Sequence, residues 1–359
     1  MKRKYVGAKR PGFSLTEMLV VVLIMGVLVG VVGSLMGNFV TNFEITDDQS
    51  IARRRAQDVF NILQTPILNA GLGIPPNRFD HYFAPVSGLG GAPIRTWDGP
   101  IEVIPHDASV TSFVATENRG EALRVVYSIH SGVKNVSDAD ITTFSGPLGS
   151  EAHTELTLTG NAPIGGGDGI LIAGAGTNMV RSYITFPGIS MHPEMVTAYD
   201  PANMRLTVYG KTPHAESGND VVSRDVIRPY HDMFLVKAGL AYVDDNGTFC
   251  LYDINDDVFE RGDKLPTAAK ADADGELVYR VEGIKAVRFV REMSGDTVRG
   301  VNVHVLAEGD NAVTGRSSTS FAVQQLRNRW PEIINWNDEM YYEDFEMRWR
   351  TRNIEAHTP

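Results

Sequence analysis

An uncharged, apolar run near the N-terminus constrains this chain more than any other feature. Residues 18–36 are 19 consecutive positions without a charged side chain, and as a helix they measure about 28 Å. That length is close to the ~30 Å hydrocarbon core of a bilayer, so the run predicts a membrane-spanning helix. Residues 1–12 carry five Lys or Arg and no acid. A basic flank of this kind predicts that the N-terminus stays in the cytoplasm and that the rest is exported.

A cleavable secretory signal is a competing interpretation of the same segment. It would need a shorter apolar stretch, followed by a cleavage site built from small residues. Residues 30–34 offer only a poor version of that site, so an uncleaved anchor fits better. An anchor alone leaves Glu17 unexplained, because a carboxylate within an apolar helix costs about 2.5–3.5 kcal/mol on insertion scales. Glu17 therefore needs a partner and is expected to be functional.

The residues around Glu17 resemble a known processing signal. Gly12-Phe13-Ser14-Leu15-Thr16-Glu17, placed between a basic leader and an apolar run, is similar to the class III signal of type IV pilins and type II secretion pseudopilins. In that family a prepilin peptidase cuts after the glycine and methylates the new N-terminal amine. The resemblance implies cleavage between Gly12 and Phe13 and N-methylation of Phe13. It also implies that Glu17 pairs with the Phe13 amine of a neighbouring subunit during assembly.

The helical pattern continues beyond the membrane span. Its apolar positions recur at helical spacing, which predicts an amphipathic helix that packs on a solid surface. These positions are Ile45, Ala52, Ala56, Val59, Phe60, Leu63 and Ile67. The opposite face includes three consecutive arginines at 53–55, which we interpret as solvated rather than lipid-binding. Pro66 and the glycines and prolines after it end the pattern, so one helix is expected from about Phe13 to about Asn69.

After residue 73 the apolar period changes to two, which predicts short strands. The segments that show it are residues 123–129, 156–158, 170–173, 206–208, 277–281 and 301–305. Asp245-Asn246-Gly247 predicts a hairpin turn with positive φ at both central positions. We expect no second helix of similar length. The predicted fold class is therefore α+β, with a long N-terminal helix packed on a β-rich, mainly antiparallel globular domain.

The aromatic residues near the C-terminus allow two interpretations. Tyr341, Phe345 and Trp349 lie four residues apart, as they would along one face of a helix. Phe345, Met347 and Trp349 also alternate with four charged residues, as they would on a strand. The alternation is cleaner, so we favour a strand that buries the three apolar side chains. An exposed docking surface for another subunit is the alternative, since exposed aromatic residues mark interfaces.

Segments of the β-rich part resemble one branch of the superfamily, the PilW-like minor pilins. The resemblance rests on four short strands, the last of which closes the domain. They are residues 167–172, 279–284, 301–306 and 348–354. The chain departs from that pattern in length, because residues 211–230 and 308–337 look like loop insertions. Because these matches are short and degenerate, the resemblance does not assign the partners of PilW-like minor pilins to this chain.

Cofactor-binding and catalytic motifs are not expected in this chain. The glycine-rich segment 165–169 lacks the Lys-Ser/Thr of a phosphate-binding loop, and the glycines at 174–176 lack the rest of a dinucleotide fingerprint. No H-E-x-x-H or G-x-S-x-G motif occurs, and His304 and Cys250 each lie within an apolar strand pattern. We therefore predict no enzyme activity, no catalytic residues and no cofactor.

Metal and nucleic-acid binding are also not expected. The acidic segments 253–257 and 272–276 offer oxygen ligands, but neither has the Glu at position twelve of an EF-hand loop, so polar turns are the better interpretation. A single cysteine excludes an intrachain disulfide. The net charge of −11, from 33 Lys+Arg and 44 Asp+Glu, argues against broad nucleic-acid affinity.

The expected organisation follows from these observations and the resemblance. Residues 1–12 form the leader, 13–43 the transmembrane and filament-core helix, 44–70 its amphipathic continuation, and 71–359 the exported domain. The resemblance implies a structural minor pilin of a type IV pilus, anchored in the inner membrane with its domain in the periplasm before it enters the pilus. Its partners would be prepilin peptidase and other pilins. The alternatives are a J-type minor pseudopilin of type II secretion and an uncleaved, membrane-anchored binding protein.

Overall fold

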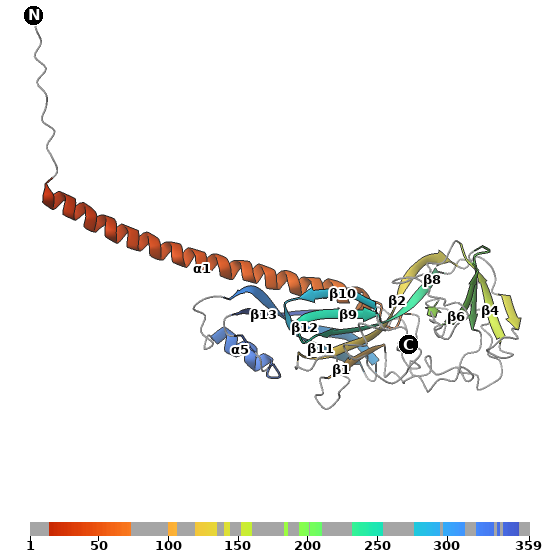
Figure 1. Cartoon of the computed structure of the whole chain (residues 1–359). Helices are drawn as coiled ribbons and strands as arrows, with labels where there is room; N and C mark the ends of the chain where they lie inside the picture. The colour runs from red at the N-terminus through yellow and green to blue at the C-terminus, as the bar shows by residue number, and fades with distance from the viewer. Residues whose placement is uncertain are drawn as a thin grey trace, which may run out of the picture.

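The computed structural model describes most of the N-terminal helix and the strands of the domain. The described residues are 14–72, 100–105, 119–134, 140–143, 152–159, 183–185, 194–200, 202–209, 232–253, 276–294, 297–312, 321–333, 336–337 and 340–351. Among them a long helix leads into a β-rich domain, and every strand ladder is antiparallel (Figure 1). This confirms the α+β fold class. The expected strand at 170–173 and the glycine-rich segments at 165–169 and 174–176 lie outside the described residues.

Helix α1 (Leu15–Leu68) is 54 residues long. Its first part projects away from the domain, and its second part lies along it (Figure 1). The buried side chains of the second part follow the predicted stripe from Ala52 to Ile67, with the addition of Asp48 and Pro66, whereas Ile45 is only half-buried. The helix ends at the expected position near Asn69, and Pro66 lies in its last turn, where a proline removes only one backbone hydrogen bond. The chain leaves helical geometry at Asn69, whose N–H donates to the carbonyl of Thr65.

The larger sheet contains the first ten described strands. Their order is β1-β2-β8-β5-β6-β7-β4-β3, with β9 pairing with both β8 and β10. They are β1 (Ile101–Ile104), β2 (Ala122–Lys134), β3 (Asp140–Thr143), β4 (Ala152–Thr157), β5 (Tyr183–Thr185), β6 (Glu194–Asp200), β7 (Arg205–Tyr209), β8 (Asp232–Val243), β9 (Thr248–Asp253) and β10 (Glu276–Glu282). The long strands β2 and β8 carry the sheet from the part beside α1 to the distal part that holds β6 and β4 (Figure 1).

The smaller sheet has the order β11-β12-β13. Its strands are β11 (Ile284–Ser294), β12 (Thr297–Ala312) and β13 (Met340–Arg350). One face packs on α1, and the short helix α5 (Phe321–Arg329) with the turn after it covers part of the other through Trp330 and Ile333. The expectation that residues 308–337 form a loop is therefore wrong, and the other expected loop, residues 211–230, lies outside the described residues. β12 extends into that segment, and α5 buries apolar surface that the sheet would otherwise expose.

Strand β13 settles the two interpretations of the C-terminal aromatic residues. Val301, Val303 and Val305 of β12 stand opposite Trp349, Met347 and Phe345, so these side chains share the face that packs on α1. Trp349 is 8% exposed, and its ring meets that of Phe60 edge-on at 5.7 Å between centroids. The predicted strand is confirmed, and the helical alternative is wrong. Trp349 is part of the core rather than an exposed docking residue.

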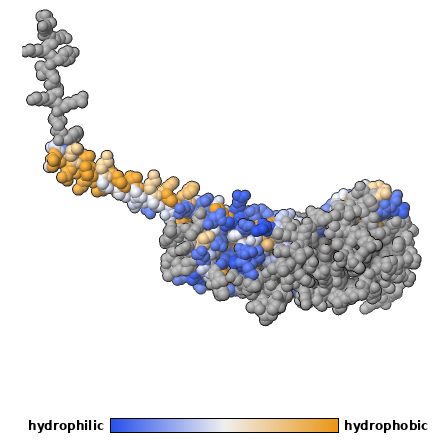
Figure 2. All heavy atoms as spheres, in the orientation of Figure 1, coloured by the Kyte–Doolittle hydropathy of each residue, from blue (hydrophilic) through white to orange (hydrophobic). Residues whose placement is uncertain are grey.

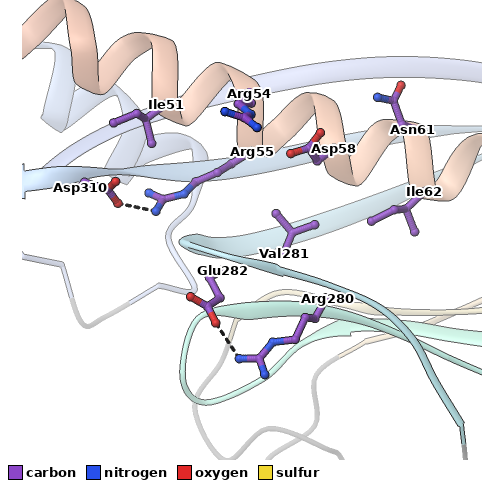
Figure 3. A pocket seen from close by; sticks show the side chains of 10 residues that line it. All are labelled: Ile51, Arg54, Arg55, Asp58, Asn61, Ile62, Arg280, Val281, Glu282 and Asp310. Atoms are coloured by element: carbon purple, nitrogen blue, oxygen red, sulfur yellow. Dashed lines mark hydrogen bonds and ion pairs between the residues drawn. The ribbon is translucent and has the colours of Figure 1, made fainter.

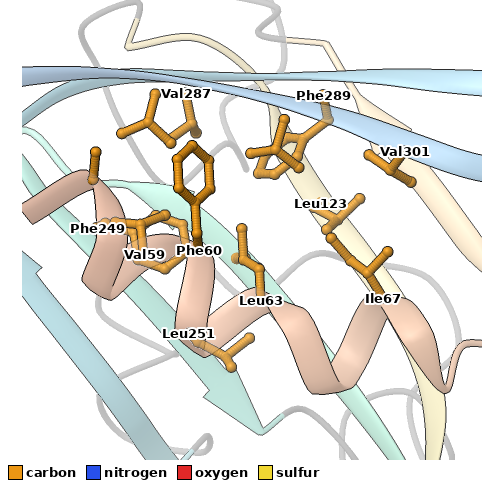
Figure 4. Packing of buried hydrophobic residues seen from close by; sticks show 14 of the residues in the cluster. Val59, Phe60, Leu63, Ile67, Leu123, Phe249, Leu251, Val287, Phe289 and Val301 are labelled. Atoms are coloured by element: carbon orange, nitrogen blue, oxygen red, sulfur yellow. The ribbon is translucent and has the colours of Figure 1, made fainter. Parts of the chain in front are cut away.

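The main core lies where α1 crosses both sheets (Figure 4). Phe60, Leu63 and Ile67 point from the helix into the core. The larger sheet borders this core on one side and the smaller sheet on the other. The labelled residues opposite them are Leu123, Phe249, Leu251, Val287, Phe289 and Val301. Because a helix this apolar on one face is not stable alone in water, burial against two sheets is what fixes the second half of α1.

Two glycines with positive φ join the sheets. Gly283 (φ +74°) is the single residue between β10 and β11, and a Cβ there would collide with the Arg55 guanidinium of α1. Gly120 (φ +93°) forms a parallel bridge to Val287, and a Cβ there would collide with the Val287 carbonyl. Only glycine combines this backbone geometry with such close approach.

The turn between β8 and β9 is a hairpin, as predicted, but of another type. The Asp244 N–H donates to the Thr248 carbonyl at 2.9 Å, and three residues lie between them. Gly247 has a positive φ of 74°, and Asn246 does not have one. The expectation of positive φ at both central positions is wrong, because in a three-residue loop only the last residue needs the left-handed conformation.

Candidate functional site

The residues predicted to matter most lie at and before the start of α1. Gly12 and Phe13 lie outside the described residues. Glu17 is described and lies in the first turn of the helix. The site that can be built from the structure is therefore Glu17, the residues that hold it, and the helix surface that follows.

Ser14 holds Glu17 in a capping box. Oε2 of Glu17 accepts hydrogen bonds from the backbone N–H of Ser14 at 2.8 Å and from its hydroxyl at 3.0 Å. In return the N–H of Glu17 donates to Oγ of Ser14 at 3.2 Å. The first N–H groups of a helix have no partner within it, and this arrangement satisfies two of them. We did not assign a role to Ser14 from the sequence, although Ser-x-x-Glu before an apolar run is the pattern of this cap.

The surface of α1 from Leu15 to Phe43 is exposed and mostly apolar, interrupted by Glu17 and, near its end, by Asn38, Thr41 and Asn42. Every described side chain in this stretch is exposed, including Leu15 at 82% and Phe43 at 65%. Figure 2 shows it as a hydrophobic rod that meets a mostly hydrophilic domain surface where described residues are drawn. By length and composition this helix could cross a membrane. In water such a surface would be strongly unfavourable, so it needs lipid or protein around it.

The exposed apolar stretch is longer than a bilayer core. Residues 15–43 measure about 43 Å as a helix, whereas the hydrocarbon core is about 30 Å thick. At about 100° per residue, Phe43 lies on the side of α1 opposite the buried Ala52. Phe39, at 69% exposure, and Met36 share that side. An apolar stripe therefore faces away from the domain near the point where the helix reaches it.

Arg55 and Asp48 fasten α1 to the end of β12. The Arg55 guanidinium donates to the Glu308 carbonyl at 2.6 Å and forms an ion pair with Asp310. Asp48 is fully buried and accepts the N–H of Asp310 at 3.2 Å, where Gly309 leaves room for it. The interpretation of residues 53–55 as one solvated face holds for the first two arginines and is wrong for Arg55, which is part-buried. Asp48 lies four residues before Ala52, so helical spacing places it on the predicted buried face, but a charged side chain predicts exposure there.

A groove of about 830 Å³ runs between this part of α1 and the edge strand β10 (Figure 3). Its ten lining side chains are Ile51, Arg54, Arg55, Asp58, Asn61, Ile62, Arg280, Val281, Glu282 and Asp310. Two ion pairs, Arg55 with Asp310 and Arg280 with Glu282, tie up four of its six charged groups. The lining offers no histidine, cysteine, serine or threonine. Of the two ion pairs, Arg55 with Asp310 holds the helix on the domain, whereas Arg280 with Glu282 lies within β10.

The described part of the domain has few other reactive groups in one place. No three His, Cys, Asp or Glu side chains there lie close enough together to hold a metal ion. Cys250 in β9 is 4% exposed, and its thiol lies 3.7 Å from the carbonyl oxygen of Thr248. Of the acidic segments weighed as calcium ligands, only Asp253 and Glu276 lie within the described residues.

Comparison with known families supports the interpretation of the N-terminal segment. Residues 7–33 match the prokaryotic N-terminal methylation motif. Comparisons with curated proteins and with solved structures each gave no match. The motif covers Gly12, Phe13, Ser14 and Glu17, and it implies processing by a prepilin peptidase and assembly with other pilins. The chain thus carries a type IV pilin-like prepilin signal on a membrane-anchoring helix, which supports its place in the pilin and pseudopilin superfamily.

Proposed function

We propose that this chain is a structural minor pilin of a type IV pilus, similar to PilW-like minor pilins, and that it contributes to pilus assembly. The observation that carries the proposal is a methylation motif joined to a helix whose apolar surface is longer than a bilayer needs. A membrane anchor alone requires only the length of the bilayer core. The excess, which includes Phe39 and Phe43, suits packing against other apolar helices.

The proposed life cycle assigns a role to each part of the chain. Residues 1–12 are the leader, which prepilin peptidase removes by cutting between Gly12 and Phe13 before it methylates Phe13. Residues 13–43 first anchor the subunit in the inner membrane and later pack in the filament. Residues 44–70 join that helix to the exported domain, residues 71–359, which lies in the periplasm and then on the pilus.

Glu17 is proposed to set the register between subunits. Cleavage creates an amine at Phe13 in surroundings of low dielectric, where an unpaired charge is costly. The carboxylate of a neighbouring subunit would compensate that charge. Both hydrogen bonds from Ser14 go to Oε2 of Glu17, so an amine that approaches Oε1 can be accommodated without breaking the cap.

The test compares Glu17→Val with Glu17→Gln. Glutamine keeps the capping box, because its carbonyl oxygen can accept the same hydrogen bonds, but it has no charge to pair with the amine. Valine loses both. If the charge sets the register, both variants insert normally into the membrane. The amount of each variant in sheared filaments should fall at least about tenfold relative to wild type, since breaking a buried ion pair costs about 3–5 kcal/mol.

Four results would contradict parts of the proposal. Normal incorporation of both variants would show that Glu17 does not pair in trans, and normal incorporation of glutamine alone would assign it only to the helix cap. Wild-type chain that enters filaments in cells without prepilin peptidase would contradict the processing step. Recovery with secretion-system pseudopilins, and absence from pili, would assign the same device to type II secretion.

A further inference from the structure

The side of α1 that faces away from the domain continues its exposed apolar stretch with charged residues. Phe39 and Phe43 are followed by Asp47, Arg54 and Asp58, and all five side chains are exposed. At about 100° per residue, each lies within about 60° of the direction opposite the face that packs on the domain. One stripe along the helix therefore leads from apolar side chains to an acid, a base and a second acid.

Two of these charges border the groove beside α1. Arg54 and Asp58 line it from the helix side (Figure 3). The other four charged groups of the groove are paired with each other, and no ion pair joins Arg54 or Asp58 to them. The two charges are thus available to a second molecule that approaches this side of the helix.

We propose that this stripe binds α1 of a second copy of the chain, parallel to the first and displaced from it by four residues along the axis. Both copies have the apolar span at the same end, so one membrane orients the two helices in parallel. Without a displacement, Asp47, Arg54 and Asp58 would each lie against the same charge of the other copy, which is unfavourable. With the displacement, Arg54 of the first copy lies level with Asp58 of the second, and Asp47 of the first lies within one turn of Arg54 of the second.

The length of the exposed apolar stretch permits this displacement. Four residues measure about 6 Å along a helix, whereas the stretch exceeds the bilayer core by about 13 Å. One copy can therefore move by four residues along its axis while apolar surface still fills the whole bilayer core.

The inference rests on the proposed function, because the second copy is a neighbouring subunit. The proposed pairing of the Phe13 amine with Glu17 of the next subunit has the same four-residue displacement in the same direction. Arg54 and Asp58 would thus repeat, outside the membrane, the register that Glu17 sets within it.

Cross-linking between two full-length copies in membranes measures the displacement. One copy carries Phe39→Cys, and a second copy with a different tag carries Phe43→Cys, since the displacement places these two positions level. A control pair carries Phe43→Cys in both copies and tests helices without a displacement. Chains whose sole cysteine is Cys250 give the background. We expect more disulfide-linked product from the displaced pair than from the control pair.

A charge reversal placed in one copy at a time tests the ion pair. Asp58→Arg in the copy with Phe43→Cys puts two arginines level, so the yield of linked product should fall at least about threefold. The same substitution in the copy with Phe39→Cys should have little effect, because that residue 58 lies level with Ile62 of the other copy. A folding defect would lower the yield in both placements. Arg54→Asp in the copy with Phe39→Cys should restore the yield that Asp58→Arg lowers.

Three results would overturn the inference. They are equal yields from the displaced and control pairs, equal effects of Asp58→Arg in the two copies, and no linked product from any pair. Each would leave the proposed function standing if the chain enters sheared filaments. The expected cross-linking pattern in a chain that never enters filaments would instead contradict the proposed function and support the contact between copies.

Discussion

Glu17 and Asp48 are two carboxylates on one helix whose roles differ in how far a sequence can reveal them. Glu17 stands out because it interrupts an apolar run, and its cap by Ser14 is a local pattern three residues long. Asp48 lies in a polar stretch where exposure is the default expectation. Its burial depends on Gly309 and Asp310, which lie more than 250 positions further along the chain. Such a contact cannot be predicted from periodicity.

Glu121 should make the folded state less stable as the pH rises. Burial raises its pKa above the ordinary 4.5, although the N–H of Phe289 donates to it at 2.7 Å. Because the folded state then binds the proton more tightly than the unfolded state, stability falls as the pH rises from 4.5 through the raised value. Glu121→Gln keeps an acceptor without the charge. Its melting temperature relative to wild type should therefore increase between about pH 4 and about pH 7.

Glu121→Ala is the control for that experiment. It removes the acceptor and leaves the Phe289 N–H without its partner, which should lower the free energy of unfolding by about 1 kcal/mol. Equal pH dependence in the wild type and Glu121→Gln, measured by thermal melting in detergent, would show that Glu121 is not the responsible group.

Secondary elements were predictable where they are long enough to show a period. The 54 residues of α1 show both the apolar run and the later stripe, and the alternation in β13 covers its second half, residues 345–350. Helix α5 has nine residues, about two and a half turns, and its apolar contacts come mainly from Trp330 and Ile333 after it. A segment that short carries too little pattern to separate it from a loop.

Trp349 should be among the most important side chains for the packing of β13 on α1. Trp349→Ala removes the ring that meets Phe60 and should lower the free energy of unfolding by about 3–5 kcal/mol. Arg350→Ala on the exposed side of the same strand should change it by less than about 0.5 kcal/mol. Thermal melting of the full-length variants in detergent measures both. Equal melting temperatures for the two variants would contradict the core position of Trp349.

Arg55 should hold α1 on the domain, whereas its neighbour Arg53 should not. Arg55→Ala removes the contacts to the Glu308 carbonyl and to Asp310, so we expect a loss of about 1–2 kcal/mol. Arg53 is exposed, and Arg53→Ala should be neutral within about 0.5 kcal/mol. Denaturant titration of the two variants is the measurement. Equal losses would mean that helix propensity, rather than this anchor, determines the result.

At the scale of the whole molecule, the sequence predicted the two kinds of structure but not their arrangement. A helix stripe predicts that something packs on it, and alternation predicts sheets. Neither pattern predicts that α1 lies across two sheets, or that these sheets are joined at Gly120 and Gly283. Those junctions depend on close contacts between segments far apart in the chain. The exposed apolar surface of the projecting helix was easier to predict, because it depends on no tertiary contact.

The central claim is that this helix becomes an assembly element only after the leader is removed. Cleavage before Phe13 would leave 28 Lys+Arg against 44 Asp+Glu and place a methylated amine four residues from Glu17. The most direct measurement is the intact mass of the chain extracted from membranes of cells with and without prepilin peptidase. We expect a chain that begins at N-methylated Phe13 where the peptidase is present, and one that begins at Met1 where it is absent. A chain that still begins at Met1 in cells with the peptidase would contradict the account.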